Sequence, residues 1–201
     1  MKKNNRLTLA KSIPWLLVIG GVIGMICSFI ITEDKFKLAA NHNFIPSCNL
    51  NPIIACGNVM SSAQGSVFGF PNSFIGLATF AALATIGVGI IAGARYKRWF
   101  WLGLEGGVLL GLVFAYWLLF ESVYRIHALC PYCLTVDVVV IALSWYLTLY
   151  NVDSGNIKLS GKVNKYYGFA RAHHLDIYVL WLLVTTAIIL KHFWYYYGHY
   201  L

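Results

Sequence analysis

The stretch HALCPYCLTVDVVVIALSWYLTLY, residues 127–150, begins with a Cys-Pro-Tyr-Cys motif and continues as an apolar run. From residue 133 to 150 this run is nearly long enough for a helix across a membrane core, which needs about 20 residues. Four further apolar runs of similar length lie at residues 13–31, 73–94, 99–120 and 175–194. Apolar residues make up 59% of the chain and charged residues only 11%, which is typical of membrane proteins. The sequence therefore predicts an all-α membrane protein in which residues 1–201 form one domain with five spans.

The distribution of Lys and Arg predicts the orientation, because cytoplasmic segments of membrane proteins retain positive charge. If the N-terminus is cytoplasmic, the inner segments hold Lys2, Lys3, Arg6, Lys11, Arg95, Lys97, Arg98, Lys158, Lys162, Lys165 and Arg171. The outer segments then hold only Lys35, Lys37, Arg125 and Lys191. We therefore expect a cytoplasmic N-terminus and an extracytoplasmic C-terminus. Topology alone explains the net charge of +8, so no nucleic-acid binding is predicted.

With this orientation, four of the five cysteines fall on the outer side. Cys48 and Cys56 lie in the outer segment 32–72, and Cys130 and Cys133 open the fourth span from its outer end. This side of a bacterial plasma membrane is an oxidising compartment. Cys27 lies inside the first span and is interpreted as a buried, inert residue. The positions of the other four cysteines favour thiol-disulfide chemistry.

The Cys-Pro-Tyr-Cys motif is suited to redox chemistry if Cys130 lies in the first turn of a helix. Free backbone N–H groups and the positive end of the helix dipole would then lower the pKa of its thiol. Pro131 fits this position, since proline is tolerated in a first helical turn. Cys133 would lie on the same face, about 5–6 Å away between Cβ atoms, close enough for a disulfide.

The expected depths of the two motif cysteines suggest a direction for electron flow. One would lie nearer to water and the other nearer to lipid, so the pair could take electrons from an outer protein and deliver them to a molecule in the bilayer. Quinone is the obvious acceptor of this kind. Cys48 and Cys56, on an outer loop, would act as a shuttle through mixed disulfides.

Two alternative roles exist for the cysteines. Structural disulfides would add little to a small protein that is already anchored by five helices. A zinc site with four thiolate ligands is a second alternative, although seven residues separate Cys48 from Cys56, a wide gap for such a site. A soluble glutaredoxin-like domain is excluded, because no alternation of strands and helices surrounds the motif.

A longer pattern joins these elements. The stretch SCNLNPIIACGNVMSSAQGSVFGFPNSFIGL, residues 47–77, contains Cys-x7-Cys, a pair of serines five residues later and an Asn-Ser-x-x-Gly helix start. A Cys-x-x-Cys motif follows at residues 130–133. This combination resembles the bacterial branch of the vitamin K epoxide reductase family. The matching elements extend from Cys48 to Asp137, and the predicted spans extend the likeness over most of the chain.

The resemblance implies a fold and a route for electrons. The fold would be a four-helix bundle around a quinone, either ubiquinone or menaquinone, with a fifth peripheral helix and an extracytoplasmic capping loop. Cys48 would exchange with a thioredoxin-like or DsbA-like partner, and Cys56 would relay to Cys130. Cys133 would reduce the quinone.

Four further residues are expected to contact the quinone. By resemblance, Asn72 is a hydrogen-bond donor to a quinone oxygen, and Ser62 is the small hydroxyl residue that follows the loop pair. The apolar residues Ile53, Ile54, Val59 and Met60 indicate a short half-helix that covers the pocket, with Met60 against the quinone ring. Asp137 lies one turn, about 6 Å, below Cys133. A carboxyl group there is costly without a partner or a task. We expect it to hydrogen-bond the quinone or pass a proton, and a structural hydrogen bond to a neighbouring helix is the alternative.

The sequence thus predicts an enzyme of the bacterial inner membrane that reoxidises a DsbA-like protein and reduces quinone. Many bacterial relatives resemble a fusion with a thioredoxin-like domain, whereas this chain ends at HFWYYYGHYL, residues 192–201, so the partner is expected to be a separate protein. A quinone or quinone-epoxide reductase of the vitamin K type is an enzymatic alternative. A non-enzymatic metal-binding membrane protein is the alternative from another class.

Overall fold

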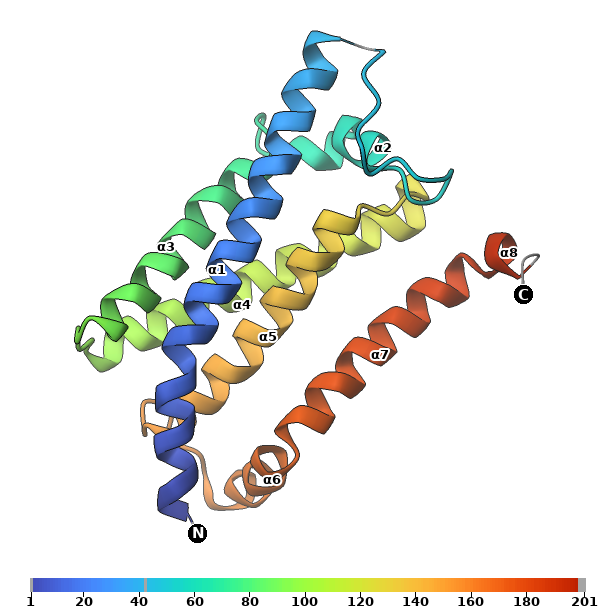
Figure 1. The fold of residues 1–201 in the computed structure, drawn as a ribbon. Helices are drawn as coiled ribbons and strands as arrows, with labels where there is room; N and C mark the ends of the chain where they lie inside the picture. The colour runs from blue at the N-terminus through green and yellow to red at the C-terminus, as the bar shows by residue number, and fades with distance from the viewer. Residues whose placement is uncertain (1, 42, 199–201) are drawn as a thin grey trace.

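The computed structural model describes residues 2–41 and 43–198, which are mainly helical (Figure 1). In this part of the chain, five helical segments are long and apolar enough to cross a membrane. They are Leu9–Ala40, Ser73–Ile91, Arg98–Ile126, Pro131–Asp153 and His174–His192. The predicted fold class, an all-α membrane protein, is confirmed.

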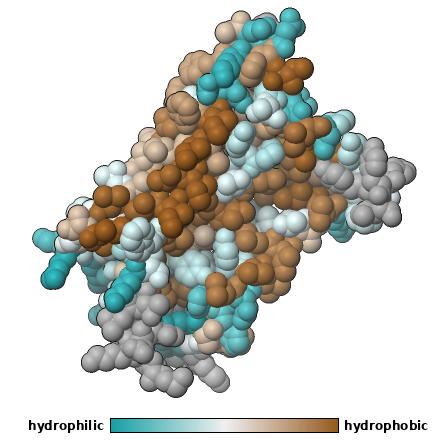
Figure 2. All heavy atoms as spheres, in the orientation of Figure 1, coloured by the Kyte–Doolittle hydropathy of each residue, from teal (hydrophilic) through white to brown (hydrophobic). Residues whose placement is uncertain are grey.

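Four long helices form a bundle: α1 (Lys2–Ala40), α3 (Ser73–Ile91), α4 (Arg98–Glu121) and α5 (Pro131–Asp153). Helix α1 packs on both α3 and α5, and α4 packs on α5. The core between them consists of apolar side chains that include Ile13, Leu17, Phe80, Leu83, Leu143 and Leu147. Figure 2 shows hydrophobic residues over the middle of one face and hydrophilic residues mainly toward the helix ends, as a surface in contact with lipid requires.

Helix α1 continues well beyond the apolar run that predicts it. It has 39 residues and ends at Ala40, so the first nine residues of the expected outer segment are helical. An ion pair one turn apart, with 2.7 Å between Lys37 Nζ and Glu33 Oε1, supports this extension. Ile31 and Leu38 also pack against the cysteines, which holds the end of α1 over the bundle.

A short cap connects α1 to α3. It contains α2 (Cys56–Ser61) and the 3₁₀ helix η1 (Ala63–Ser66). The expected half-helix is therefore present, with Val59 and Met60 inside it. Ile53 and Ile54 lie just before α2, where Ile54 forms an isolated bridge with Leu129.

The remaining helices lie at the edge of the bundle. They are α6 (Gly161–Ala172), α7 (His174–His192) and α8 (Trp194–Tyr197), and α7 runs beside the bundle (Figure 1). Two hydrogen bonds connect α7 to α4: Trp181 Nε1 donates to the Tyr116 hydroxyl at 2.6 Å, and that hydroxyl lies 3.0 Å from Thr185 Oγ1. The fifth long helix is thus peripheral, as expected.

Candidate redox site

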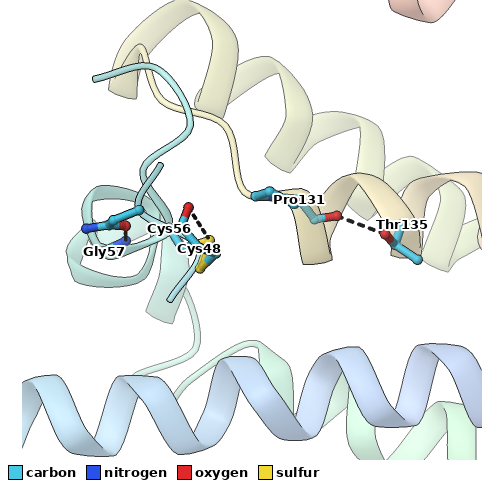
Figure 3. Close-up of a disulfide and its surroundings, with 6 residues drawn as sticks. Cys48, Cys56, Gly57, Pro131 and Thr135 are labelled. Carbon is cyan, nitrogen blue, oxygen red and sulfur yellow. Dashed lines mark hydrogen bonds between the residues drawn. A yellow bond between two sulfur atoms is a disulfide. The ribbon is translucent and has the colours of Figure 1, made fainter. Parts of the chain in front are cut away.

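The structure brings the four predicted redox cysteines together. Cys48 and Cys56 form a disulfide with their Cα atoms 5.8 Å apart, while Cys130 and Cys133 are free thiols. Cys48, Cys56, Met60 and Cys130 belong to one buried cluster, and Cys133 packs against it. Figure 3 shows the disulfide near the start of α5, where Pro131 is labelled. The loop pair and the motif pair are therefore packed within one site.

A short backbone bridge sets the position of the two pairs. Leu129 N–H donates to the Ile53 carbonyl at 2.7 Å, and Ala55 N–H donates to the Leu129 carbonyl at 3.1 Å. Ala55 directly precedes Cys56, and Leu129 directly precedes Cys130. Two backbone hydrogen bonds thus hold the cysteine of the cap beside the first cysteine of the motif.

Packing beneath the bridge supports it. Ile53 and Leu129 form a buried cluster with Val123, just after α4, and with Phe193, which follows α7 and is fully buried. The Asn51 side chain accepts hydrogen bonds from the backbone N–H groups of Ile53 at 2.9 Å and Ile54 at 2.7 Å. The peripheral helix therefore contributes to the position of the cysteines, a role that its sequence alone does not indicate.

Cys130 has the environment of a reactive thiol. It is the N-cap residue of α5, and Pro131 is the first residue of the helix. The pKa of Cys130 lies below its ordinary value, mainly because the Cys133 thiol donates a hydrogen bond to its thiolate. Burial acts in the opposite direction, and the backbone N–H groups of Cys133 and Tyr132 add to the lowering. A stabilised thiolate at this position is both a better leaving group and an available nucleophile.

A cavity of about 640 Å³ lies beside the cysteines, between α3, α4 and α5 and below the cap. This volume is within the range of about 300–1,000 Å³ that is usual for small-molecule sites. Its wall is mostly apolar and is reached by both motif cysteines. All four predicted quinone-contacting residues line it: Met60, Ser62, Asn72 and Asp137. The lining thus fits an apolar ring with a few polar groups around it.

Ser62 and Asn72 also hold the cap in shape. The Ser62 hydroxyl donates to the Val59 carbonyl at 2.7 Å, so its only proton is already engaged. Asn72 Nδ2 donates to the Gln64 carbonyl at 2.7 Å, and Asn72 Oδ1 accepts from Val67 N–H at 3.2 Å. The Asn72 amide keeps a second N–H. Of these two side chains, Asn72 is therefore the better donor to a ligand.

Polar residues that sequence analysis did not single out also line the cavity. Lys35, on the extended part of α1, donates to the Gly65 carbonyl at 3.2 Å and to the Ser66 hydroxyl. Gln64 Nε2 donates to Glu121 Oε2 at 3.2 Å. These contacts connect the cap to α1 and α4. Glu33 and Lys37 carry opposite charges and lie four residues apart, a spacing typical of ion pairs within a helix. This pattern in the sequence could have placed Lys35, which lies between them, on a helix.

The zinc alternative requires several ligands around one point. Within residues 2–41 and 43–198, no three or more His, Cys, Asp and Glu side chains are grouped so that they could hold a metal ion. Two of the four clustered cysteines are instead joined as a disulfide.

The model of the vitamin K epoxide reductase family matches residues 15–148. The chain belongs to this family. The matched region contains most of α1 and extends through most of α5, so it includes the cap and all four clustered cysteines. No match was found among curated proteins. Membership identifies the protein as an oxidoreductase of a quinone-linked family, and the disulfide between Cys48 and Cys56 fits that chemistry.

Proposed function

We propose that this protein oxidises the thiols of a DsbA-like or thioredoxin-like protein and passes the electrons to quinone. A partner thiolate attacks Cys48, and the released Cys56 thiolate attacks Cys130 in its disulfide with Cys133. Each exchange breaks one disulfide as it forms another, so two electrons move inward without a metal. The observation that supports this route best is the backbone bridge that holds Cys56 beside Cys130.

The final acceptor in this proposal is a quinone, ubiquinone or menaquinone, in the cavity beside Cys133. When bound, quinone supplies a two-electron oxidant that is dissolved in the membrane. Met60 contacts the ring, Asn72 donates to one oxygen, and Asp137 donates or relays a proton at the other end of the site. The apolar wall and the position of these groups along it support this assignment.

The proposed location is the bacterial plasma membrane, with the cysteine site on the extracytoplasmic side. The excess of Lys and Arg in the segments assigned to the cytoplasm supports a cytoplasmic N-terminus. The thiol partner would then be a soluble protein of the oxidising compartment, acting in trans. A strongly oxidising partner of the DsbA type, with a potential of about −120 mV, needs an acceptor as strong as a quinone.

Trapping tests the order of the relay. In a Cys56→Ala variant, Cys48 cannot be released by its neighbour, so a mixed disulfide between Cys48 and the partner should accumulate on nonreducing gels. Cys48→Ala is the matched control and should trap no partner. Accumulation in Cys48→Ala and not in Cys56→Ala would reverse the assigned roles.

Counting thiols tests the acceptor. The reduced protein should lose its four site thiols when a short-chain ubiquinone or menaquinone is added, and quinol should form in proportion. Cys133→Ala should leave the quinone unreduced. Quinol formation by Cys133→Ala at the wild-type rate would contradict the proposed role of Cys133, and consumption of a quinone epoxide alone would favour the vitamin K type reaction.

A further inference from the structure

Asp34 lies on the face of α1 that covers the cysteine site. Ile31, three residues earlier, and Leu38, four residues later, both pack against the cluster of cysteines. Residues at this spacing share one face of a helix, so Asp34 is directed to the same side. Figure 3 shows α1, in blue, running past the disulfide and the start of α5. The negative charge of Asp34 also acts against ionisation of Cys130, whose lowered pKa is due mainly to the hydrogen bond from Cys133.

The carboxyl group of Asp34 is buried and incompletely paired. The residue is only 6% exposed, and its Oδ2 atom has no hydrogen-bond partner. The residues on either side are paired: Glu33 with Lys37, and Lys35 with the cap. A buried carboxyl group that lacks a partner opposes folding, so its presence on the helix face that covers the cysteines points to a chemical role.

We propose that Asp34 carries the proton that accompanies electron transfer between the two cysteine pairs. This inference rests on the relay proposed above. In the step that regenerates the disulfide of the cap, the Cys48 thiol gives its proton to the Asp34 carboxylate. The Cys48 thiolate then attacks Cys56 in its mixed disulfide with Cys130. The bond between Cys56 and Cys130 breaks, Cys130 leaves as a thiolate, and Asp34 returns the proton to it.

The arrangement of the site explains why such a group is needed. A thiol must lose its proton before it attacks, and the leaving thiolate must finally gain one, so each thiol-disulfide exchange requires the transfer of one proton. Cys48, Cys56 and Cys130 are all buried, which limits exchange of that proton with water. The described structure shows Cys48 joined to Cys56 with Cys130 free, which is the state that this step produces. Asp34 is a proton acceptor and donor on the wall of this buried cluster.

A single-turnover experiment tests the proposal. The full-length protein, with both cysteine pairs oxidised by diamide, is mixed with one equivalent of dithiothreitol, quenched with acid at set times and alkylated. Mass spectrometry then follows the appearance of the thiol at Cys130, which is released only in the step assigned to Asp34. Asp34→Asn should slow this phase by about 10²-fold, the lower range of what a positioned acid-base group contributes. Glu33→Gln, one residue away on an exposed side, should keep the wild-type rate, and Asp34→Glu should recover part of it.

The dependence on pH separates proton transfer from a structural role. In the elements around Asp34, the titratable and charged groups are Glu33, Lys35, Lys37, Cys48, Cys56, Cys130, Tyr132, Cys133 and Asp137. All of them remain in Asp34→Asn, so the difference from wild type reports on Asp34 itself. Without the carboxylate, the attacking thiol must ionise to solvent, and the defect should shrink as the pH approaches about 8.5, the ordinary pKa of a thiol.

The outcomes distinguish this inference from the relay on which it rests. Because no quinone is present, the result does not depend on the identity of the acceptor. Cys56→Ala measures direct reduction of the inner pair by dithiothreitol. If wild type is no faster than Cys56→Ala, the relay itself is wrong and the role of Asp34 falls with it. If wild type is faster than Cys56→Ala, the relay stands. In that case Asp34 is not its proton carrier if the transfer rates of Asp34→Asn and Glu33→Gln are equal, or if the rate defect of Asp34→Asn is the same at every pH.

Discussion

The two sides of α3 have very different surroundings, although glycines line both. Toward α1, a Cβ atom added at Gly21 would lie 2.6 Å from the Ala84 nitrogen and 2.8 Å from the Phe80 oxygen, both in the α3 backbone. On α4, which faces α3 across the cavity, a Cβ atom at Gly103, Gly107 or Gly111 would meet no atom within 4 Å. Glycine thus permits close packing at the interface of α1 with α3, the closed interface, and leaves space for the cavity between α3 and α4, the open interface.

This difference shows how a small bundle can be stable and hollow at once. Helices in membranes gain stability mainly from close packing, which small residues permit. Helices α1 and α3 are packed in this way, and α4 also packs on α5, so these contacts can hold the bundle together. The glycines of α4, spaced four residues apart on one face, leave room for a ligand without loss of those contacts.

Filling the open interface should have the largest effect. In Gly107→Leu, the new side chain would enter the cavity and displace a bound quinone from the motif cysteines. We expect quinone-dependent turnover to fall by about 10²-fold, since misplacement of reacting groups by about 1 Å can cost that much. Thermal stability should not fall, because leucine is a better helix former than glycine by about 1 kcal/mol. Quinol formation and thermal unfolding in detergent measure the two effects.

The neighbouring glycine provides a matched control. Gly106 also has no atom within 4 Å of an added Cβ, but it does not line the cavity. Gly106→Leu should therefore keep wild-type turnover. Equal loss of activity in both variants would mean that bulk anywhere on α4 is harmful, and the comparison between the two sides of α3 would fail.

Filling the closed interface should cost stability instead. In Gly21→Ala, the added methyl group would clash with the backbone of α3, which cannot turn away as a side chain can. Overpacking of this kind costs about 1–3 kcal/mol in the free energy of unfolding. Denaturation in mixed micelles would measure the loss. Gly20→Ala should cost less, since its Cβ would meet only side-chain methyl groups, the nearest at 3.2 Å on Val139, and equal losses would contradict the assigned contact.

The comparison also shows what the sequence could and could not reveal. Apolar runs predict the long helices, because membrane spans need length and hydropathy alone. The order of the cysteines and the stretch from residue 47 to 77 predict which residues gather at the cavity. In contrast, Gly20 and Gly21 resemble Gly106 and Gly107 as dipeptides, and only the neighbouring helix decides whether each is packed or open.

The missed parts of the site have a similar cause. The extension of α1 beyond residue 31 carries charges, so hydropathy ends the predicted span there, although the Glu33–Lys37 ion pair and the packing of Leu38 against the cysteines support a longer helix. Asp34 then appears in the sequence as one polar residue in an exposed segment. Its burial is set by the packing around this part of α1, where Lys35 contacts the cap, and the sequence does not show such contacts between distant parts of the chain.

The packed interface of α4 and α5 offers a test of a buried carboxyl group that has partners. Glu105 is buried, accepts a hydrogen bond from Asn151 Nδ2 at 3.1 Å and accepts another from Thr148. Glu105→Leu leaves both donors without this acceptor, which should cost about 1–3 kcal/mol in the free energy of unfolding. Single-turnover transfer between the cysteine pairs should be unchanged. A slowed transfer with normal stability would contradict the division between packed and reactive interfaces.

The smallest expected effect is a change in the titration of Cys130, at the rim of the open interface. Its pKa is lowered chiefly by the hydrogen bond from Cys133, so the thiolate persists to lower pH than in an ordinary cysteine. In a Cys27→Ala background, ultraviolet thiolate absorbance should disappear as the pH falls through this lowered pKa. Adding Cys133→Ala removes the donor and should move the midpoint to higher pH. Because a depressed pKa favours the folded state only while the thiolate is present, the stability that this bond contributes should likewise be lost on acidification. If the midpoint did not change, the lowered pKa of Cys130 would be due to the start of α5 and not to the Cys133 thiol.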